Sequence, residues 1–553
     1  MAAHAPLPLN LTSFEEIRKS GAVYVDKTPL ICNFLRSRAP IFYSRPRGFG
    51  KTLLCSTLHS FFTHGLEYFK GLYLEQWWQE LPENQKEWFI GKAVVRLDFS
   101  AMDSGTVPDF KASFKEALKT AIAAVAPDFD AKDEWDAWMT FNKFLLSREM
   151  ASVVLLIDEY DAPLTRFADR PEDLRRVWSV LENFYAMLKS LSSKLQFFFY
   201  TGITLYQPIE LFPRFNQFDD LTRYSDCLTL LGFSEQELRL YFPTQLQHAA
   251  EILDLSVDEL CGRLKEHYGG FRFLPQDETT LYAPHSVLSF LNAPEKGFEH
   301  CWYRPGELSD RGLSSFACYC DITQGTLSQR SYLFPYALIR GEALQVDNNA
   351  KTLRPARDPK LLLFRNGYLT IKEAELDAKG KAYNLILGLT NREVTDAVIL
   401  SLREALGATL KEETQNLKEA LHTGNLPELE RIFTCCLNSL DYDLGYFGSA
   451  NSCRCLIATC LFISGYEVNS QAYISSERND FLLTLAEDKL CYSFEFREQP
   501  EDAEPEKTLQ EILEQAATNE YVLPETYALK RVAVVLEPDY RRIVKMALVR
   551  ERA

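Results

Sequence analysis

The sequence predicts an α/β protein: a parallel sheet with crossover helices, then a helical subdomain, then a second domain that mixes α and β structure. Between residues 40 and 200, short apolar runs alternate with longer stretches of helical periodicity, which is the pattern of a parallel sheet. After Leu228 the strand signals fade and short amphipathic helices follow. The length of 553 residues, at about 150 residues per domain, corresponds to three or four such units.

Four apolar runs supply the strands of the predicted sheet: IFYS, AVVRLDF, VVLLI and QFFFY. Residues 109–125 and 171–191 have helical periodicity and supply two of the crossover helices. Beyond the sheet, LGFSEQELRLYF, LQHAAEILDL and VDELCGRLKEHY each join a polar start to an apolar face, as short amphipathic helices do. We therefore assign residues 1–228 to a sheet domain and 229–350 to a helical lid subdomain.

The rest of the chain returns to β structure. Residues 361–372 (LLLFRNGYLTIK), followed by YNLILGL, predict strands, and a mostly helical span over 392–440 comes next. An apolar helix around 449–464 precedes the strand-like runs YEVNSQAYI, DFLLTLA and LCYSFEF. An acidic loop, a final helix and the strand RVAVVLEP complete the pattern. These elements define a connecting region, 351–440, and an α+β domain, 441–553.

Composition restricts the partners of the chain. It carries 60 basic and 77 acidic residues, a net charge of −17, so it does not coat nucleic acid over most of its surface and any DNA site must be local. The N-terminus has no basic region followed by an apolar stretch, and the apolar stretch at 453–465 is shorter than the about 20 residues of a membrane span. We expect a cytoplasmic protein with no membrane partner. Its oligomeric state does not follow from the sequence.

A phosphate-binding loop follows the first predicted strand. Such a loop needs glycine where backbone N–H groups turn toward anionic oxygens, a lysine for the terminal phosphates and a hydroxyl for magnesium at the helix N-terminus. Gly50, Lys51 and Thr52 supply all three, directly before the helical segment LLCSTLHSFF. The standard pattern would have its first glycine where this chain has arginine, so a surface turn that contains GKT is a second interpretation. The predicted nucleotide-binding residues of the loop are Arg45, Arg47, Gly48, Phe49, Gly50, Lys51 and Thr52.

The strand VVLLI ends in a pair of acids that favours the phosphate-binding interpretation. In a P-loop ATPase, an aspartate at this place holds magnesium together with the loop hydroxyl, and the next glutamate polarises the attacking water. Asp158 and Glu159 occupy these positions. A buried strand with solvated acids at its carboxyl end is the alternative. The distance from Lys51 to Asp158 leaves room for an intervening strand, which predicts an ATPase of the additional-strand, catalytic-glutamate type.

Two further polar residues follow strands in this part of the chain. Thr201 comes at the end of QFFFY, where it either senses the terminal phosphate of a nucleotide or is an ordinary strand-end threonine. Asp161 either takes part in catalysis or caps the next helix. We count Thr201 among the predicted nucleotide-binding residues.

A second candidate site lies in the final domain. Asp480 opens the strand DFLLTLA, and Glu495 lies near the end of LCYSFEF. If Glu487 and Asp488 form the turn between them, the strands pair as a hairpin with Asp480 directly opposite Glu495. Opposed carboxylates are unfavourable, with β-carbons about 5 Å apart, unless a cation or proton lies between them. The pair therefore predicts a magnesium site of the kind that nucleases use.

The residue two positions after Glu495 departs from that kind of site. A magnesium nuclease has a lysine there, on the same strand face, to stabilise or activate the water. Here position 497 is arginine. Arg497 supplies positive charge but cannot act as a base, because the pKa of a guanidinium is above about 12.

The order of the sequence blocks resembles one family, the bacterial AAA-like ATPases that carry a C-terminal PD-(D/E)XK nuclease-like domain. The RPRxFGKT form of the loop is usual in that family, so the arginine in place of the first glycine agrees with it. The resemblance implies binding of ATP and Mg²⁺ at Lys51, Thr52, Asp158 and Glu159. Arg272 matches the YxGxR block, which places it either at the nucleotide or in packing. The blocks are VYVDKTPLI (23–31), SRPRGFGKTLL, LLIDEYDAP, YTGIT, LGFSEQEL (231–238), HYGGFRF (267–273), YAPHSVLSFL (282–291) and NGYLTIK (366–372).

The resemblance extends to the second site. Asp480, Glu495 and Arg497 resemble the D…ExK core of the family, and Gln515 resembles its later glutamine. The resemblance implies an ATPase coupled to a module that cleaves or binds DNA, with a role in genome defence or mobile elements by analogy. Two departures favour an alternative: the lysine is arginine, and the glutamate of the preceding helix falls at Ala450 or a neighbour. That alternative is a nucleotide-controlled switch whose degenerate nuclease-like domain only binds a partner.

Overall fold

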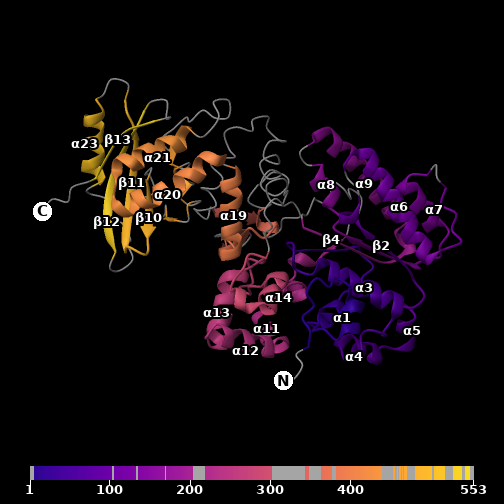
Figure 1. Cartoon of the computed structure of the whole chain (residues 1–553). Coiled ribbons are helices and arrows are strands. Elements are labelled where there is room, and N and C mark those ends of the chain that lie inside the picture. Colours follow the sequence, from indigo (N-terminus) through magenta and orange to yellow (C-terminus); the bar gives the residue numbers. More distant parts are fainter. Residues whose placement is uncertain are drawn as a thin grey trace. The chain divides into compact units, whose positions relative to one another are not determined.

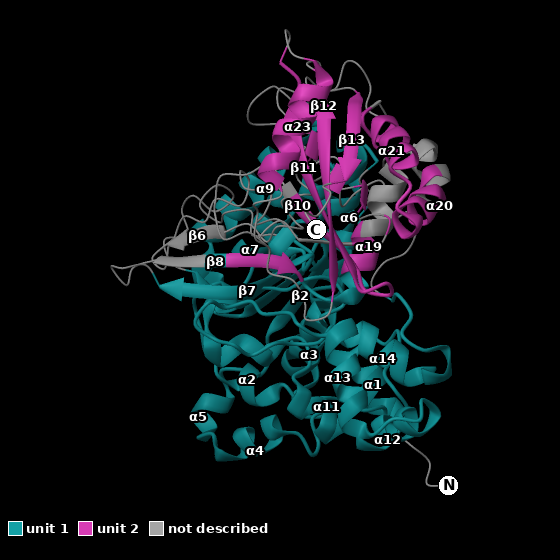
Figure 2. Cartoon of the chain, turned by 90° about the vertical axis from the view of Figure 1, so that its left-hand side faces the viewer, with its two compact units in different colours: residues 1–307, 344–385, 390–394 teal, residues 308–343, 386–389, 395–553 magenta. Residues whose placement is uncertain are grey.

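The computed structural model covers two compact units of the chain, coloured separately in Figure 2. The first unit comprises residues 1–307, 344–385 and 390–394, and the second comprises 308–343, 386–389 and 395–553. The structure describes residues 5–102, 105–132, 135–167, 170–203, 218–301, 343–347, 363–376, 382–405, 407–438, short pieces of 453–469, 480–500, 504–516, 527–537 and 542–548. The predicted boundaries at 228, 350 and 440 stay predictions.

The first unit contains a parallel five-stranded sheet, which confirms the predicted α/β class. Its order is β2-β3-β4-β1-β5, and every neighbouring pair runs parallel. The strand β4 therefore separates β1, which leads into the phosphate-binding loop, from β3, which ends at Asp158. The sequence did not predict β5, because two residues are too few to produce a pattern. The strands are β1 (Ile41–Ser44), β2 (Ala93–Asp98), β3 (Val153–Asp158), β4 (Leu195–Gly202) and β5 (Asp219–Asp220).

Helices cover both faces of this sheet (Figure 1). On one face, α3 packs against β2, β3 and α1, and on the other α6 packs against β2, α7 and α9. Every residue of β3 and β4 is buried, as expected for central strands of a parallel sheet. The helices of this part are α1 (Phe14–Ser20), α2 (Thr28–Cys32), α3 (Lys51–His64), α4 (Tyr73–Glu80), α5 (Glu83–Lys86), α6 (Val107–Val125), α7 (Ala137–Leu146), α8 (Ala162–Arg166) and α9 (Pro171–Ser190).

The predicted helical subdomain is present as four short helices in the same unit. Capping boxes start two of them: Ser234 pairs with Glu237, and Ser256 with Glu259. Their apolar faces share one core, which also takes in Val25 from the N-terminal segment. This shared burial stabilises helices that are too short to be stable alone. They are α11 (Glu235–Tyr241), α12 (Pro243–Ile252), α13 (Val257–Tyr268) and α14 (Pro284–Asn292).

A small sheet of order β6-β8-β7 follows, made of β6 (Ala343–Asp347), β7 (Leu369–Leu376) and β8 (Ala382–Leu389). The strand predicted over 361–372 is only partly correct. Residues 363–365 form a helical turn, and β7 begins after it. The reason is Gly367, whose φ of +83° turns the chain sharply before the strand can start.

The second unit holds a mixed sheet of order β13-β12-β11-β10-β9. The strands β10 and β11 form an antiparallel hairpin, and β12 runs parallel to β11 after the crossover helix α23, which packs on β11, β12 and β13. The sequence did not predict β13. The elements are α19 (Arg392–Ala405), α20 (Gly407–Thr423), α21 (Leu426–Asn438), β9 (Glu467–Asn469), β10 (Asp480–Leu485), β11 (Leu490–Glu498), α23 (Pro505–Ala516), β12 (Ala528–Leu536) and β13 (Ile543–Leu548).

None of the helices within the described ranges combines the length and the apolar character that crossing a membrane requires.

Candidate functional site

The loop between β1 and α3 has the backbone that a phosphate-binding loop needs. Gly48 and Gly50 adopt left-handed conformations, with φ of +76° and +97°, and α3 begins directly at Lys51. A side chain at these two positions would be strained, so glycine is required there. Arg45 is not among the described residues with positive φ. Position 45 therefore does not need the glycine that the standard pattern has there.

Lys51 lies at the centre of this loop. Its Nζ donates hydrogen bonds to the carbonyl oxygens of Arg45 at 3.1 Å and Pro46 at 3.2 Å. The same atom lies 3.3 Å from Oε1 of Glu159, and the Lys51 side chain is 4% exposed. The structure thus joins the predicted lysine of the loop to the predicted glutamate that directly follows β3, which is far away in the sequence.

Asp158, the last residue of β3, is fully buried. Neither of its carboxylate oxygens receives a hydrogen bond from any residue that the structure describes. The pKa of Asp158 is raised to about 6, first by burial and then by the charge of Glu159, while the nearby Thr52 hydroxyl acts to lower it. Buried acceptors without a donor are unfavourable, and a divalent cation between Asp158 and Thr52 would satisfy them. The residues present therefore fit a magnesium ion.

A third acid at this edge escaped the sequence analysis. Asp98 ends β2 and pairs in register with Asp158, because the carboxyl ends of parallel strands meet at one edge. Its charge also raises the pKa of Asp158. The carboxylate of Asp98 accepts hydrogen bonds from the backbone and side chain of Ser100. The available signal in the sequence was the aspartate near the end of the run AVVRLDF.

The residues after β3 are held in unusual geometry. Glu159 has a φ of +49°, which is rare for a residue with a side chain. Asp161 occupies the N-cap position of α8, but its carboxylate does not cap that helix. It accepts a hydrogen bond from the backbone N–H of Ile203 at 3.1 Å, and any Cβ on Gly202 would collide with it. The interpretation of Asp161 as a side-chain cap is wrong: it ties the end of β3 to the end of β4.

Thr201 connects the two central strands. It is fully buried in β4, and its hydroxyl donates to the carbonyl of Tyr43 in β1 at 2.6 Å. The hydroxyl proton is therefore used within the sheet. A role of Thr201 in sensing phosphate stays a prediction.

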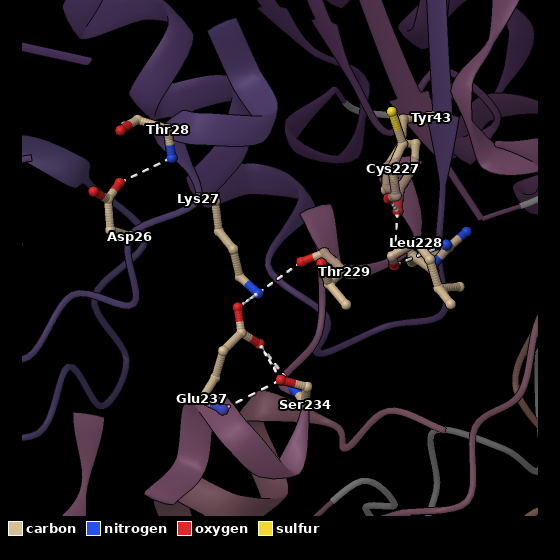
Figure 3. A network of polar contacts seen from close by, with 10 residues as sticks. Asp26, Lys27, Thr28, Tyr43, Cys227, Leu228, Thr229, Ser234 and Glu237 are labelled. Atoms are coloured by element: carbon tan, nitrogen blue, oxygen red, sulfur yellow. Dashed lines mark hydrogen bonds and ion pairs between the residues drawn. The ribbon is translucent and has the colours of Figure 1, made fainter. Parts of the chain in front are cut away.

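A polar network joins the first strand and the N-terminal VDKT block to the segment before α11 (Figure 3). The Tyr43 hydroxyl donates to the carbonyl of Cys227 at 2.6 Å. The ammonium of Lys27 donates to the carbonyl of Thr229 at 2.6 Å and pairs with the carboxylate of Glu237, which also caps α11. Burial lowers the pKa of Lys27, and the Glu237 charge opposes that shift.

Arg45 belongs to the same region. The side chain is 2% exposed, and its guanidinium donates to the carbonyls of Ser44 at 2.9 Å and Leu228 at 3.2 Å. It also lies 4.6 Å from the ring of Tyr43 and 4.4 Å from that of Phe273. These contacts hold the guanidinium against Ser44 and Leu228, while its buried Nε has no hydrogen-bond partner among the described residues. Direct contact of Arg45 with nucleotide stays a prediction, as it does for the exposed Arg47.

The phosphate-binding loop is also held from the helical subdomain. The carbonyl of Gly48 accepts a hydrogen bond from the backbone N–H of His285 at 3.3 Å. The carbonyl of Phe49 accepts one from the backbone N–H of Gly232 at 3.2 Å. The buried ring of Phe49 packs against Phe271 and Phe273, with centroids 4.9 and 5.6 Å away. These aromatic residues flank Arg272.

Arg272 itself makes contacts within its own loop. Its guanidinium donates to the carbonyls of Asp277 at 2.9 Å and Pro275 at 2.8 Å. The contact between the YxGxR block and the phosphate-binding loop is thus made by the neighbouring phenylalanines. A bond from Arg272 to nucleotide stays a prediction.

The hairpin predicted for the second site is present. The register pairs Asp480 with Glu495, with the turn at 486–489. Positions that face each other directly lie on the same side of a sheet. Glu495 is 4% exposed. The side chain of Asp480 and the whole of Ala450 lie outside the described residues.

Two other predicted residues of the second site meet each other. The guanidinium of Arg497 donates to Oε1 of Gln515 in α23 and lies 3.5 Å from Glu511. Within the part of the chain that the structure describes, no three His, Cys, Asp or Glu side chains form a group that could hold a metal ion. A metal site at Asp480 and Glu495 stays a prediction.

The raised pKa of Asp158 predicts that Asp158→Asn stabilises the metal-free protein. An acid whose pKa is raised on folding destabilises the native state as pH rises from 3.8 to about 6, and fully above that range. At 1.36 kcal/mol per pKa unit, the effect at pH 8 is about 3 kcal/mol. We expect the variant to have a higher Tm than the wild type at pH 8 in the presence of a chelator, and a smaller advantage at pH 4.5. Equal differences at both pH values would contradict the raised pKa.

Two comparisons show which known proteins the chain is similar to. Residues 8–212 match the family model described as "Predicted AAA-ATPase", which implies ATP binding and hydrolysis. A protein of Azotobacter chroococcum mcd 1, described as "Uncharacterized protein in vnfD 5'region", is 25% identical over 451 residues. These residues cover 79% of this chain and 78% of that protein. The matched range of the family model contains the parallel sheet up to β4 and ends before the second unit.

Proposed function

We propose, from the match of residues 8–212 to the predicted AAA-ATPases, that the chain binds ATP with Mg²⁺ and hydrolyses it. The observation that carries the proposal is the convergence of Lys51, Asp158 and Glu159 at the carboxyl edge of the sheet, with Lys51 and Glu159 in direct contact. In open α/β sheets this edge is where ligands bind. The left-handed glycines before α3 support the same assignment.

Each residue has a separate task in this proposal. The backbone N–H groups of the loop and the ammonium of Lys51 bind the phosphates. Thr52 and Asp158 hold Mg²⁺, which when bound neutralises charge on the phosphate oxygens. Glu159 accepts a hydrogen bond from the attacking water and orients it. Asp161 fixes the chain after Glu159 through its bond to Ile203, and so positions that carboxylate.

The test is phosphate release from ATP by the purified full-length chain, with Mg²⁺ and with a chelator in its place. We expect turnover with Mg²⁺ and none with the chelator. Binding of ATP without any effect of Mg²⁺ would contradict the roles of Thr52 and Asp158.

A second activity is proposed for the other unit: a divalent-metal site at Asp480 and Glu495, in a domain that cleaves or binds DNA. The register that pairs the two positions favours it. Arg497 favours the version in which the domain only binds a partner, because its guanidinium already pairs with Gln515 and Glu511. Cleavage of DNA by the full-length chain with Mg²⁺ or Mn²⁺ distinguishes the two versions.

Metal binding at the second site should appear as thermal stabilisation. In an Asp158→Asn background, which disables the first metal site, we expect 10 mM Mg²⁺ or Mn²⁺ to raise the Tm of the second unit by a few °C, since ligand at about 100 times its Kd stabilises by about 2.7 kcal/mol. Adding Asp480→Asn and Glu495→Gln should abolish this rise while the fold is kept. Glu514→Gln, which removes an exposed acid of the same unit, is the matched control. If the metal raised the Tm equally with and without the Asp480→Asn and Glu495→Gln substitutions, the site would be excluded.

A further inference from the structure

The turn that precedes β7 lies against the phosphate-binding loop. A Cβ on Gly367 would come within 2.8 Å of Cγ of Pro46 and 3.1 Å of the Phe271 ring. The carbonyl of Gly367 accepts from the Thr390 hydroxyl at 2.7 Å, and the N–H of Tyr368 donates to the carbonyl of Leu363 at 2.9 Å. The turn is thus fixed next to the loop, although more than 300 residues separate them in the sequence.

Arg365 is the charged residue of this turn. Its side chain is partly buried, and its Nε is fully buried without a hydrogen-bond acceptor. The guanidinium makes no hydrogen bond or ion pair with any residue that the structure describes. A guanidinium stays charged under all ordinary conditions, so a buried one without an acceptor is unfavourable. Among the residues that the structure describes, none supplies an anion within hydrogen-bond distance of this guanidinium, so a bound anion would stabilise it.

The charges around Arg365 indicate where that anion lies. Arg365 is close enough to Asp220, Tyr160 and Arg223 to interact with them electrostatically. Tyr160 directly follows Glu159, the residue proposed to orient the attacking water. Asp220 is the acid whose charge acts on Arg365, but its carboxylate accepts from the N–H of Thr222 at 3.1 Å and forms no ion pair with Arg365. Its turn contacts Pro46 of the loop and its charge interacts with Tyr160, so the guanidinium lies in the part of the unit that holds the loop and the residues after β3.

We propose that Arg365 is a further nucleotide-binding residue that contacts the terminal phosphate of ATP. This inference rests on the proposed ATP-binding function and extends it to a residue outside the matched range 8–212. A bidentate guanidinium matches the geometry and charge of a terminal phosphate group. The arginine therefore distinguishes ATP from ADP, and it couples the turn before β7 to the nucleotide.

The test compares ATP and ADP binding by the full-length chain in Mg²⁺, measured by titration calorimetry. We expect Arg365→Gln to weaken ATP binding by about 10- to 100-fold and ADP binding by less than about threefold, since one charge-assisted contact is lost with ATP alone. Arg365→Lys should recover part of the loss. Arg223→Gln is the matched control, because Arg223 is an exposed arginine near the same acid and should leave both affinities unchanged.

The outcomes separate this inference from the function on which it rests. If the wild type binds neither nucleotide, the proposed function and the inference both fail. If the wild type binds ATP and Arg365→Gln keeps the wild-type ratio of ATP to ADP affinity, only the inference fails. A loss of Tm in Arg365→Gln that Asp220→Asn reproduces, with that ratio unchanged, would show that Arg365 serves only as a counter-charge for Asp220.

Discussion

Replacing Lys51 by alanine is expected to lower the affinity for Mg²⁺ and ATP by at least about 100-fold. The ammonium lies among the carbonyls of Arg45 and Pro46 and beside Glu159, so it is the one cation held at the centre of the described loop. The loop amides alone cannot offset the charge of the terminal phosphates. Titration calorimetry of the purified chain with ATP measures the loss.

Two further variants make the Lys51 experiment specific. Lys51→Met retains the bulk of the buried side chain without its charge, so an equal loss in both variants assigns the effect to the ammonium. Lys70→Ala removes an exposed lysine of the same unit and should bind ATP as the wild type does. ATP binding of full strength in Lys51→Met would remove the phosphate-binding assignment of this loop.

Glu159→Gln is expected to leave ATP binding intact and to slow hydrolysis by about 100- to 1,000-fold. Glutamine keeps the shape of the side chain but loses the charge that polarises water. The unusual backbone at Glu159, with its φ of +49°, is no harder for glutamine to adopt, because neither residue is branched at Cβ. Steady-state phosphate release and equilibrium binding, measured on the same preparation, separate the two effects.

The contact between Lys51 and Glu159 adds a second expectation for this variant. Glutamine at 159 no longer neutralises the ammonium 3.3 Å away, so ATP should bind at least as tightly as it does to the wild type. Asp161→Asn is the variant with which the ATP affinity of Glu159→Gln is compared. It also changes a buried acid, but that acid accepts a hydrogen bond from Ile203 and does not face Lys51. Turnover unchanged by Glu159→Gln would move the catalytic role to another residue.

Local patterns predicted those parts of the fold that depend on neighbouring residues. The four apolar runs became β1 to β4, the polar starts became capping boxes of α11 and α13, and the helical periodicities became α6 and α9. The pairing of Asp480 with Glu495 also followed from the sequence, because a hairpin register is set by its turn. The GKT segment and the acids at the end of β3 led to the predicted residues of the first site, and the structure brings Lys51 and Glu159 of that prediction into contact.

Contacts between distant segments could not be predicted in this way. The two-residue strand β5, the register of Asp98 with Asp158 and the bond from Asp161 to Ile203 exist only because separate strands end at one edge. The sequence pointed to Arg272 in the YxGxR block, whereas in the folded chain Phe271 and Phe273 contact the loop. Arg365 gave no signal at all, since an arginine in a turn is ordinary until its neighbours are known.

The sequence by itself determined the α/β class and the hairpin of β10 and β11, and it singled out the lysine and hydroxyl of the loop before α3 and the two acids at the end of β3. Each of these depends on residues that are adjacent or that alternate within one element, where periodicity and turn chemistry apply. The tertiary structure decided which carboxylate is left without a donor, which cation faces Glu159 and which groups surround Arg365. Those properties follow from burial and from the approach of segments hundreds of residues apart, and both arise only when the whole chain packs.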